Sequence, residues 1–281
     1  MGGTDMNGDG SAQGARGQRI LIAIPARHAS ARFPGKPLAM LRGASGEARS
    51  LIRRSWDAAR AAAGPLGARV VVATDDARIR DHAEGFGAEA LMTPASCRNG
   101  TERCAALLDA LGDGWDAVIN LQGDAPLTPP WYVEALAGAM ARGDAGVCTP
   151  VLRASAGHAA ALRADRAAGR VGGTTAVADA AGRALYFSKE VLPFGAGLPG
   201  GPGVLHHVGV YAYSPAMLRA YALWEEGPLE RAEGLEQLRF LENGAPVLCV
   251  TVEDRGRPFW ELNNPQDIPR IETMMAEIGM G

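Results

Sequence analysis

The 281-residue sequence lacks any apolar stretch approaching the roughly 18 residues that a membrane-spanning helix requires. It also lacks an excess of positive charge, since its formal net charge is −3, and binding to extended nucleic acid normally depends on a basic surface. Residues 1–18 are polar and glycine-rich and contain no hydrophobic segment of a signal peptide, so we expect a disordered lead-in there. These absences argue against a membrane-spanning protein and against a nucleic-acid-binding protein.

Cysteine is scarce and shows no spacing typical of a metal site. The four cysteines form neither a CxxC pair nor a Cys/His cluster, and they lie at Cys97, Cys104, Cys148 and Cys249. Free thiols in a reducing compartment explain this pattern better than disulfides do. We therefore expect a cytoplasmic protein.

Two common phosphate-binding motifs, GxxxxGK(S/T) and GxGxxG, are also missing. In their place, residues 24–38 read IPARHASARFPGKPL and follow the apolar run at 20–24, which is short enough to be a buried strand. This loop combines proline and glycine with the cations Arg27, Arg32 and Lys36. A cationic loop at the end of a strand is typical of phosphate binding in α/β proteins, although a solvated basic turn has the same composition.

Strand-like apolar runs alternate with helical patterns along the first half of the chain. Strands are expected at 20–24, 70–74, 88–92, 117–121 and 145–151, with helices at 51–63, 101–111 and from Pro130. In the less regular second half, strands are expected at 174–178, 184–187, 207–213 and 247–252, with helices at 215–223, 230–242 and from Pro265. The alternation predicts an α/β fold, with a mostly parallel central sheet flanked by helices. We expect one domain over residues 19–281, in which about 152–225 form a smaller lobe.

Polar residues follow three of the expected strands, at the sheet edge where α/β proteins bind ligands. They are the segments 25–27, 74–75 and 122–124. A single carboxylate after a buried strand, such as Asp124, is a natural ligand for Mg²⁺, which takes few protein carboxylates together with substrate phosphates. Asp124 could equally be an ordinary turn residue, but a phosphate-binding loop at the same edge favours the metal role.

Other candidate residues are less distinctive on their own. Segment 99–103 begins a helix, and its free N–H groups and Arg103 could bind an anion or a base, or could simply start the helix. His206 and His207 are adjacent on a strand, so their side chains face opposite sides and do not readily bind one ion. The acidic residues of the 230–242 helix are interpreted as a solvated face.

Taken together, a series of motifs resembles one family. In chain order they are IPARHASARFPGKPL at 24–38, ATDD at 73–76, NGTERCAAL at 99–107, NLQGDAPLTPP at 120–130, ALYFSK at 184–189, HHVGVYAYSPAMLRAY at 206–221 and PLERAEGLEQLRFLENG at 228–244. They resemble 3-deoxy-manno-octulosonate (Kdo) cytidylyltransferases, the CMP-Kdo synthetases, over about residues 19–275. The first and fourth motifs are shared with sialic acid cytidylyltransferases, whereas the last two are more specific to the Kdo enzymes.

The resemblance implies a Rossmann-like nucleotidyltransferase fold, a homodimer and transfer of CMP from CTP to a 3-deoxy-ulosonic acid, with a smaller lobe for sugar binding and dimerisation. Catalytic residues would be Arg27, Lys36 and Asp124, with Asp124 binding Mg²⁺. Nucleotide-binding residues would be Ala26, Arg27, Lys36, Thr74, Asn99, Gly100 and Arg103. Sugar-binding residues would be Gln122, His207, Tyr211, Glu236 and Gln237. The product would serve bacterial surface polysaccharides such as lipopolysaccharide or capsule.

The C-terminal segment departs from the family pattern. Where the family reads GVDTPEDL, with a metal-binding aspartate, this chain reads ELNNPQDI, which puts Asn263 at the metal position and offers Glu261 or Asp267 as a substitute. Ala125 replaces a glutamate, and residues 174–177 lack the lysine of the family's NAVK segment. Three alternatives therefore stay open: a related ulosonic acid as substrate, a sialic or other nonulosonic acid, and a non-catalytic protein that binds CTP or a sugar nucleotide.

Overall fold

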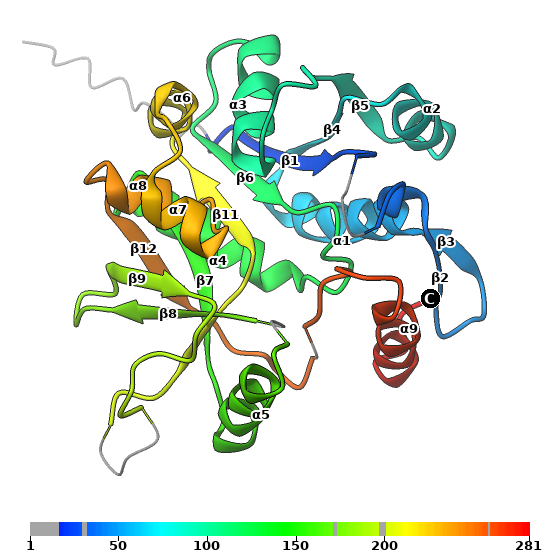
Figure 1. Ribbon diagram of the computed structural model, residues 1–281. Helices are drawn as coiled ribbons and strands as arrows, with labels where there is room; N and C mark the ends of the chain where they lie inside the picture. Colours follow the sequence, from blue (N-terminus) through cyan, green and yellow to red (C-terminus); the bar gives the residue numbers. More distant parts are fainter. Residues whose placement is uncertain (1–16, 30–32, 171–172, 197–200, 258) are drawn as a thin grey trace, which may run out of the picture.

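Figure 1 shows the computed structural model, which describes residues 17–29, 33–170, 173–196, 201–257 and 259–281. The strands are β1 (Ile20–Ala26), β2 (Met40–Arg42), β3 (Ala48–Ser50), β4 (Arg69–Thr74), β5 (Glu89–Met92), β6 (Ala117–Leu121), β7 (Val147–Arg153), β8 (Thr174–Ala178), β9 (Ala184–Ser188), β10 (Leu205–His207), β11 (Val210–Tyr213) and β12 (Val247–Thr251). The helices are η1 (Lys36–Leu38), α1 (Leu51–Leu66), α2 (Ala77–Gly85), α3 (Gly100–Leu111), α4 (Pro130–Arg142), α5 (Ala156–Ala167), α6 (Pro215–Leu223), α7 (Pro228–Glu233), α8 (Leu238–Glu242) and α9 (Asp267–Glu277). Among these helices, none is long and apolar enough to cross a membrane. Residues 1–16 of the expected lead-in and Arg32 lie outside the described residues.

The central sheet has ten strands, and its first half is parallel. The strands β5, β4, β1 and β6 lie in that order with parallel pairing throughout. The order continues with β11, β7, β10, β8 and β9, each antiparallel to its neighbour, and β12 pairs with β7 in parallel. Parallel neighbours need a long crossover, whereas antiparallel neighbours such as β8 and β9 need only a short turn. The predicted α/β class is confirmed, and the parallel pairing is concentrated at the β5 side of a mixed sheet.

Helices cover both faces of the sheet (Figure 1). β1 is buried along its whole length, as expected of a central parallel strand. Its alternating side chains enter two cores, because successive residues of a strand point to opposite faces. Leu21 packs in one cluster with Leu107 of α3, and Ile22 packs in the other with Ile52 of α1 and Leu136 of α4. The uninterrupted apolar run of β1 therefore fixes the sheet between two helical layers.

Two expected elements are interrupted in the structure. The helix expected at 230–242 is two helices, because Gly234 takes a left-handed conformation (φ 61°) that ends α7 before α8 begins. Residues 234–237 therefore form a turn between α7 and α8 and do not belong to one continuous helix. The strand expected at 207–213 is likewise divided, with β10 ending at His207 and β11 beginning at Val210. Both interruptions contribute residues to the cavity described below.

The second half also contains structure that the sequence patterns did not indicate. The helix α5 occupies an alanine-rich stretch that was expected to be irregular. Within the range 152–225, β11 lies between β6 and β7 in the central sheet. The division into a single domain with a smaller lobe stays a prediction, and β11 joins that range directly to the main sheet.

Candidate active site

A cavity of about 590 Å³ lies at the carboxyl ends of β1 and β6 and extends to β10, β11 and the turn at 234–237. It is the location that a parallel sheet with these polar strand ends predicts. Of the residues named from the sequence, those that line it are Ala26, Arg27, Lys36, Asn99, Gly100, Arg103, Gln122, Asp124, His207, Tyr211, Glu236, Gln237 and Asn263. The cavity is large enough for a ligand of nucleotide size.

Thr74 is the one predicted site residue that the structure does not bring to this cavity. It ends β4 and is completely buried. Its hydroxyl accepts a hydrogen bond from the backbone N–H of Asp76 at 3.2 Å. Thr74 therefore shapes the turn that leads into α2, and its proximity to a nucleotide stays a prediction.

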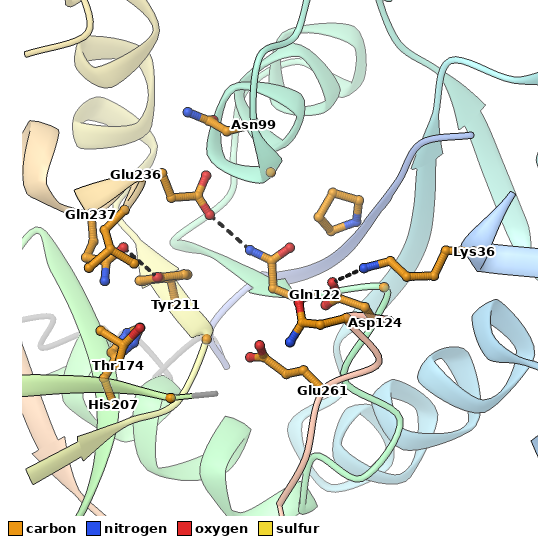
Figure 2. A pocket seen from close by; sticks show the side chains of 18 of the residues that line it. Lys36, Asn99, Gln122, Asp124, Thr174, His207, Tyr211, Glu236, Gln237 and Glu261 are labelled. Atoms are coloured by element: carbon orange, nitrogen blue, oxygen red, sulfur yellow. Dashed lines mark hydrogen bonds and ion pairs between the residues drawn. The ribbon is translucent and has the colours of Figure 1, made fainter. Parts of the chain in front are cut away.

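Lys36 and Asp124, which both line the cavity, form an ion pair with Nζ 2.6 Å from Oδ2 (Figure 2). Lys36 begins the short helix η1 after Gly35, whose positive φ of 71° turns the loop back. Asp124 follows β6 through Gly123, where a Cβ would come within 2.6 Å of the Pro25 carbonyl oxygen. Only glycine permits this close approach of the two strand ends, so the local sequence directly sets the position of the carboxylate.

Further cations line the cavity beside this pair. Arg27 is exposed and donates to the carbonyl oxygen of Arg98 at 3.2 Å. Arg103 is buried, and its guanidinium donates to Asp75 at 2.9 Å and to Thr93 at 2.6 Å. A buried guanidinium with a fixed carboxylate partner is held rigidly in place, whereas the exposed Arg27 is free to turn toward an anion.

The first turn of α3 forms one wall of the cavity. The Oδ1 of Asn99 caps the helix by accepting from the N–H of Glu102 at 2.9 Å, which leaves its amide nitrogen to donate to Tyr221 at 2.8 Å. A Cβ on Gly100 would lie 3.0 Å from the amide of Gln122. The missing side chain therefore lets Gln122 pack directly on the helix N-terminus.

Glu236 and Gln122 bridge this wall to the opposite side of the cavity. Glu236 accepts from the Thr101 N–H at 3.0 Å. It also accepts from Gln122 Nε2 at 3.0 Å, as Figure 2 shows. Burial raises the pKa of Glu236, although its hydrogen bonds with Thr101 and Gln122 oppose that shift. Gln237 accepts from the Tyr211 hydroxyl at 3.1 Å. Among the described residues its Nε2 has no hydrogen-bond partner, although it is buried, so this donor is available to a polar ligand.

The sequence-based interpretation of the 230–242 carboxylates as a solvated face is wrong for Glu230. This residue is 4% exposed and forms a two-point ion pair with Arg239, at 2.6 and 2.7 Å. The reason is the break at Gly234, which turns the second half of the expected helix and carries Arg239 back onto α7. Glu236 then falls in the turn, where it faces the cavity.

His207 enters the cavity as a neutral group. Its Nε2 lies 3.0 Å from the Thr149 hydroxyl, which in turn lies near the Val208 and Val210 carbonyl oxygens. Because the hydroxyl proton is directed to a carbonyl, His207 Nε2 is the donor, and Nδ1 carries the acceptor lone pair of the neutral ring. Burial lowers the pKa of His207 to about 3. The adjacent His206 also lines the cavity, and the centroid of its ring lies 4.9 Å from that of His158.

Oxygen donors suited to a magnesium ion line the same cavity. They are the carboxylates of Asp124 and Glu261 and the amide of Asn263. Asp267 is not among them; its carboxylate accepts from the N–H groups of Asn263 and Asn264, at 3.0 and 2.7 Å. Within the described ranges, no group of three or more His, Cys, Asp or Glu residues is placed to hold a metal. A hard cation held by few protein oxygens together with ligand phosphates fits this donor set.

Several further lining residues were given no role from the sequence, among them Lys189, Trp260 and Gly209. Lys189 ends the motif ALYFSK, so its motif was the available signal. Gly209 leaves room for Glu261, whose Oε1 would lie 2.6 Å from a Cβ placed there. In Figure 2 the Glu261 carboxylate points into the cavity. Gly209 lies within the motif HHVGVYAYSPAMLRAY, which was its available signal, whereas none of the motifs contains Trp260.

Comparison with known proteins adds independent findings. The family model for cytidylyltransferase matches residues 21–253. The 3-deoxy-manno-octulosonate cytidylyltransferase of Maricaulis maris is 44% identical over 262 residues, covering 92% of this chain and 98% of the relative. That of Myxococcus xanthus is 38% identical over 263 residues, covering 93% and 98%. The structure of CMP:2-keto-3-deoxy-manno-octonic acid synthetase complexed with CTP superposes with a TM-score of 0.77 and 32% identity, covering 93% of this chain and 100% of that one.

Proposed function

We propose that this chain, which belongs to the 3-deoxy-manno-octulosonate cytidylyltransferase family, transfers CMP from CTP to the anomeric hydroxyl of Kdo and releases pyrophosphate. One structural observation supports the proposal independently of the similarity to family members. The Lys36–Asp124 pair lies in the same cavity as a polar set made of the half-buried Gln122 and Glu236 and the buried Gln237. A triphosphate needs a cation and a metal-binding carboxylate such as Lys36 and Asp124. A polyhydroxylated sugar acid needs hydrogen-bond donors and acceptors such as those of the polar set.

The reaction joins the sugar hydroxyl oxygen to the α-phosphorus of CTP. The bond from that phosphorus to the bridging β-phosphate oxygen breaks, pyrophosphate leaves with the electron pair, and the hydroxyl proton is released to solvent. Negative charge builds on the phosphate oxygens, so catalysis depends on positioning and electrostatics. In the proposal, Lys36 moves from Asp124 to the triphosphate, and the exposed Arg27 closes on it from the loop.

Magnesium is part of the proposal, with Asp124 and Asn263 as its protein ligands. When bound, Mg²⁺ supplies positive charge that stabilises the phosphate oxygens. The oxygen chemistry of the lining residues supports it, and Glu261 adds a carboxylate in the same cavity. A neutral amide at 263 weakens cation binding relative to a carboxylate. The Glu261 carboxylate therefore affects the Mg²⁺ concentration that the enzyme requires.

The two substrates are proposed to occupy opposite sides of the cavity. On the nucleotide side we place Ala26, the first turn of α3 from Asn99 and Gly100, and Arg103. On the sugar side we place Gln122, His207, Tyr211, Glu236 and Gln237. The unpartnered Gln237 amide and the acceptor Nδ1 of neutral His207 supply one donor and one acceptor for the sugar acid.

We also propose a cytoplasmic homodimer whose product serves a surface polysaccharide such as lipopolysaccharide or capsule. All four cysteines are free in the structure, as a reducing compartment requires. The edge strand β9 exposes Leu185, which is 62% accessible, and Phe194 after it is fully exposed. Exposed large apolar groups beside a free strand edge are typical of a surface that another protein chain covers.

A pyrophosphate-release assay with CTP, Mg²⁺ and a panel of sugar acids tests this function. Kdo should give the highest kcat/KM, above modified ulosonic acids and sialic acid. Preference for another acid would redirect the substrate assignment while leaving the reaction intact. Tight CTP binding without pyrophosphate release, for every acid in the panel, would instead support a non-catalytic binding protein.

A further inference from the structure

Tyr221 of α6 is completely buried and does not line the cavity, yet its hydroxyl joins two segments that do. Asn99 Nδ2 donates to the hydroxyl at 2.8 Å. The hydroxyl donates in turn to the main-chain oxygen of Glu236 at 3.2 Å, and Glu230 Oε1 lies farther from it, at 3.5 Å. Asn99 caps α3 on the nucleotide side, and Glu236 lies in the turn at 234–237 on the sugar side. A single oxygen atom outside the cavity thus connects its two sides.

The ring of Tyr221 is held by contacts that do not involve this hydroxyl. The Arg239 guanidinium lies 4.3 Å from the ring centroid, and the Phe240 ring lies 4.7 Å away. Burial raises the pKa of the Tyr221 hydroxyl, which therefore remains protonated and able to donate. Replacing tyrosine by phenylalanine would remove every hydrogen bond of this hydroxyl and retain the packing.

Two other links run parallel to this one. Glu236 Oε2 accepts from the Thr101 N–H at 3.0 Å. Arg239 donates to Glu102 of α3 at 2.8 Å while it pairs with Glu230 of α7. The first turn of α3 and the turn at 234–237 therefore form one bonded unit, and the link through the Tyr221 hydroxyl can be removed without touching a side chain that lines the cavity.

We propose that Tyr221 is a positioning residue that couples the nucleotide side of the cavity to the sugar side. Binding of CTP against the first turn of α3 fixes Asn99, and through the Tyr221 hydroxyl it fixes the main chain at Glu236. The neighbouring Gln237 then presents its amide to the sugar acid in a set orientation. Because CTP binding has already ordered the turn at 234–237, the subsequent binding of the sugar acid has a lower entropic cost. The inference rests on the proposed assignment of the two sides.

Hydrogen exchange upon addition of CTP with Mg²⁺, and without any sugar acid, tests the coupling. In the wild-type protein, CTP should slow exchange both at 99–102 and at 234–237. In Tyr221→Phe, protection at 99–102 should persist, while the CTP-induced protection at 234–237 falls at least threefold. Tyr132→Phe is the matched control, because Tyr132 is also fully buried and its hydroxyl has no partner among the described residues.

The outcomes separate the coupling from the function on which it rests. Absence of protection at 99–102 in the wild type would refute the nucleotide site itself. Protection at 99–102 without protection at 234–237, or an equal response in wild type and Tyr221→Phe, would overturn the coupling alone. A change of the same size in Tyr132→Phe would also overturn it, because loss of any buried hydroxyl would then suffice.

Initial rates over a grid of CTP and Kdo concentrations give a second measurement. In the wild type, saturating CTP should lower the KM for Kdo about fivefold or more, the usual lower range of site–site coupling. In Tyr221→Phe that dependence should be at least halved, with a smaller change in kcat. A uniform loss of kcat with the CTP dependence unchanged is the result of a merely structural defect, and it would overturn the proposal.

Discussion

Lys36 Nζ lies 2.6 Å from Asp124 Oδ2, which joins the cationic loop after β1 to the carboxylate after β6. The main-chain oxygen of the same aspartate accepts from the N–H of Leu262 at 2.9 Å. Asp124 is therefore bonded on one side to this cationic loop and on the other to the segment that carries Glu261 and Asn263. Asp124 therefore fixes the loop that is proposed to bind the triphosphate relative to the segment that is proposed to bind the metal.

Asp124→Asn should lower pyrophosphate release by roughly 100-fold or more, because a preorganised charge next to the reacting phosphate is lost. The unfolding temperature should change little, since the pair is partly exposed to solvent, at 15% and 27%, and such pairs contribute modestly to stability. Steady-state rates and a thermal melt provide the two measurements. Near-normal turnover in the variant would eliminate both the catalytic and the metal role of Asp124.

Asp57→Asn is the matched control for that substitution. Asp57 is 32% exposed and forms ion pairs with Arg49 at 3.0 Å and with Arg53 at 3.2 Å, on α1 and away from the cavity. Its loss removes comparable charge contacts, so a similar change in unfolding temperature is expected with unchanged activity. Equal loss of activity in the two variants would mean that general destabilisation explains the effect.

Gly100→Ala should disturb the cavity through packing alone. The new Cβ would lie 3.0 Å from both amide atoms of Gln122, which must shift and weaken its hydrogen bond to Glu236. Overpacking of this kind costs about 1–3 kcal/mol, and the KM for Kdo should rise more than the KM for CTP. Gly157→Ala is the control, because nothing lies within 4 Å of its Cβ position. An unchanged KM for Kdo in Gly100→Ala would separate Gln122 from sugar binding.

The parallel half of the fold and its ligand edge could be predicted from the sequence. The run at 20–24 is apolar throughout, so it reads as a strand buried on both faces, and the polar residues at 25–27 and 122–124 mark strand ends. Because parallel strands align their carboxyl ends, that pattern places the 24–38 loop and Asp124 at one edge of the sheet, and the structure pairs Lys36 of that loop with Asp124.

The sugar side could not be derived in the same way. Glu236 and Gln237 have helical periodicity with their neighbours, and their place in a turn depends on the left-handed Gly234. The pattern is equally compatible with a continuous helix, since glycine is tolerated there at modest cost. Their partners Thr101 and Gln122 are more than 100 residues away in sequence. Only the family resemblance indicated these residues.

Stability at acidic pH should report the neutral state of His207. Its pKa is lowered to about 3 from 6.5, so between these values the unfolded chain binds the extra proton. The stabilisation is therefore complete above pH 6.5 and is lost as pH falls toward 3, at up to about 1.4 kcal/mol per pH unit for one proton. Urea unfolding at pH 7 and pH 5 measures the slope, which His207→Gln should reduce.

His206 contributes to this slope as well, because burial lowers its pKa to about 4. His206→Gln therefore serves as the comparison, and each single variant should remove part of the dependence. If His207→Gln and the wild type show the same slope, the imidazole titrates normally in the folded protein. The hydrogen-bond assignment to Thr149 would then be wrong.

Metal binding should respond in opposite directions to two substitutions on the C-terminal segment. Asn263→Asp adds a carboxylate to the cavity and should lower the Mg²⁺ concentration needed for half-maximal rate, since Mg²⁺ prefers charged oxygen ligands. Glu261→Gln removes a cavity carboxylate and should raise that concentration. Paramagnetic Mn²⁺ in place of Mg²⁺ gives a direct affinity without turnover.

The Leu262 N–H donates to the main-chain oxygen of Asp124. Glu261 and Asn263, on either side of Leu262, therefore lie in the same wall of the cavity as Asp124. Identical Mn²⁺ affinity in wild type and Asn263→Asp would remove residue 263 from the ligand set, and a loss confined to Glu261→Gln would assign the second oxygen to Glu261.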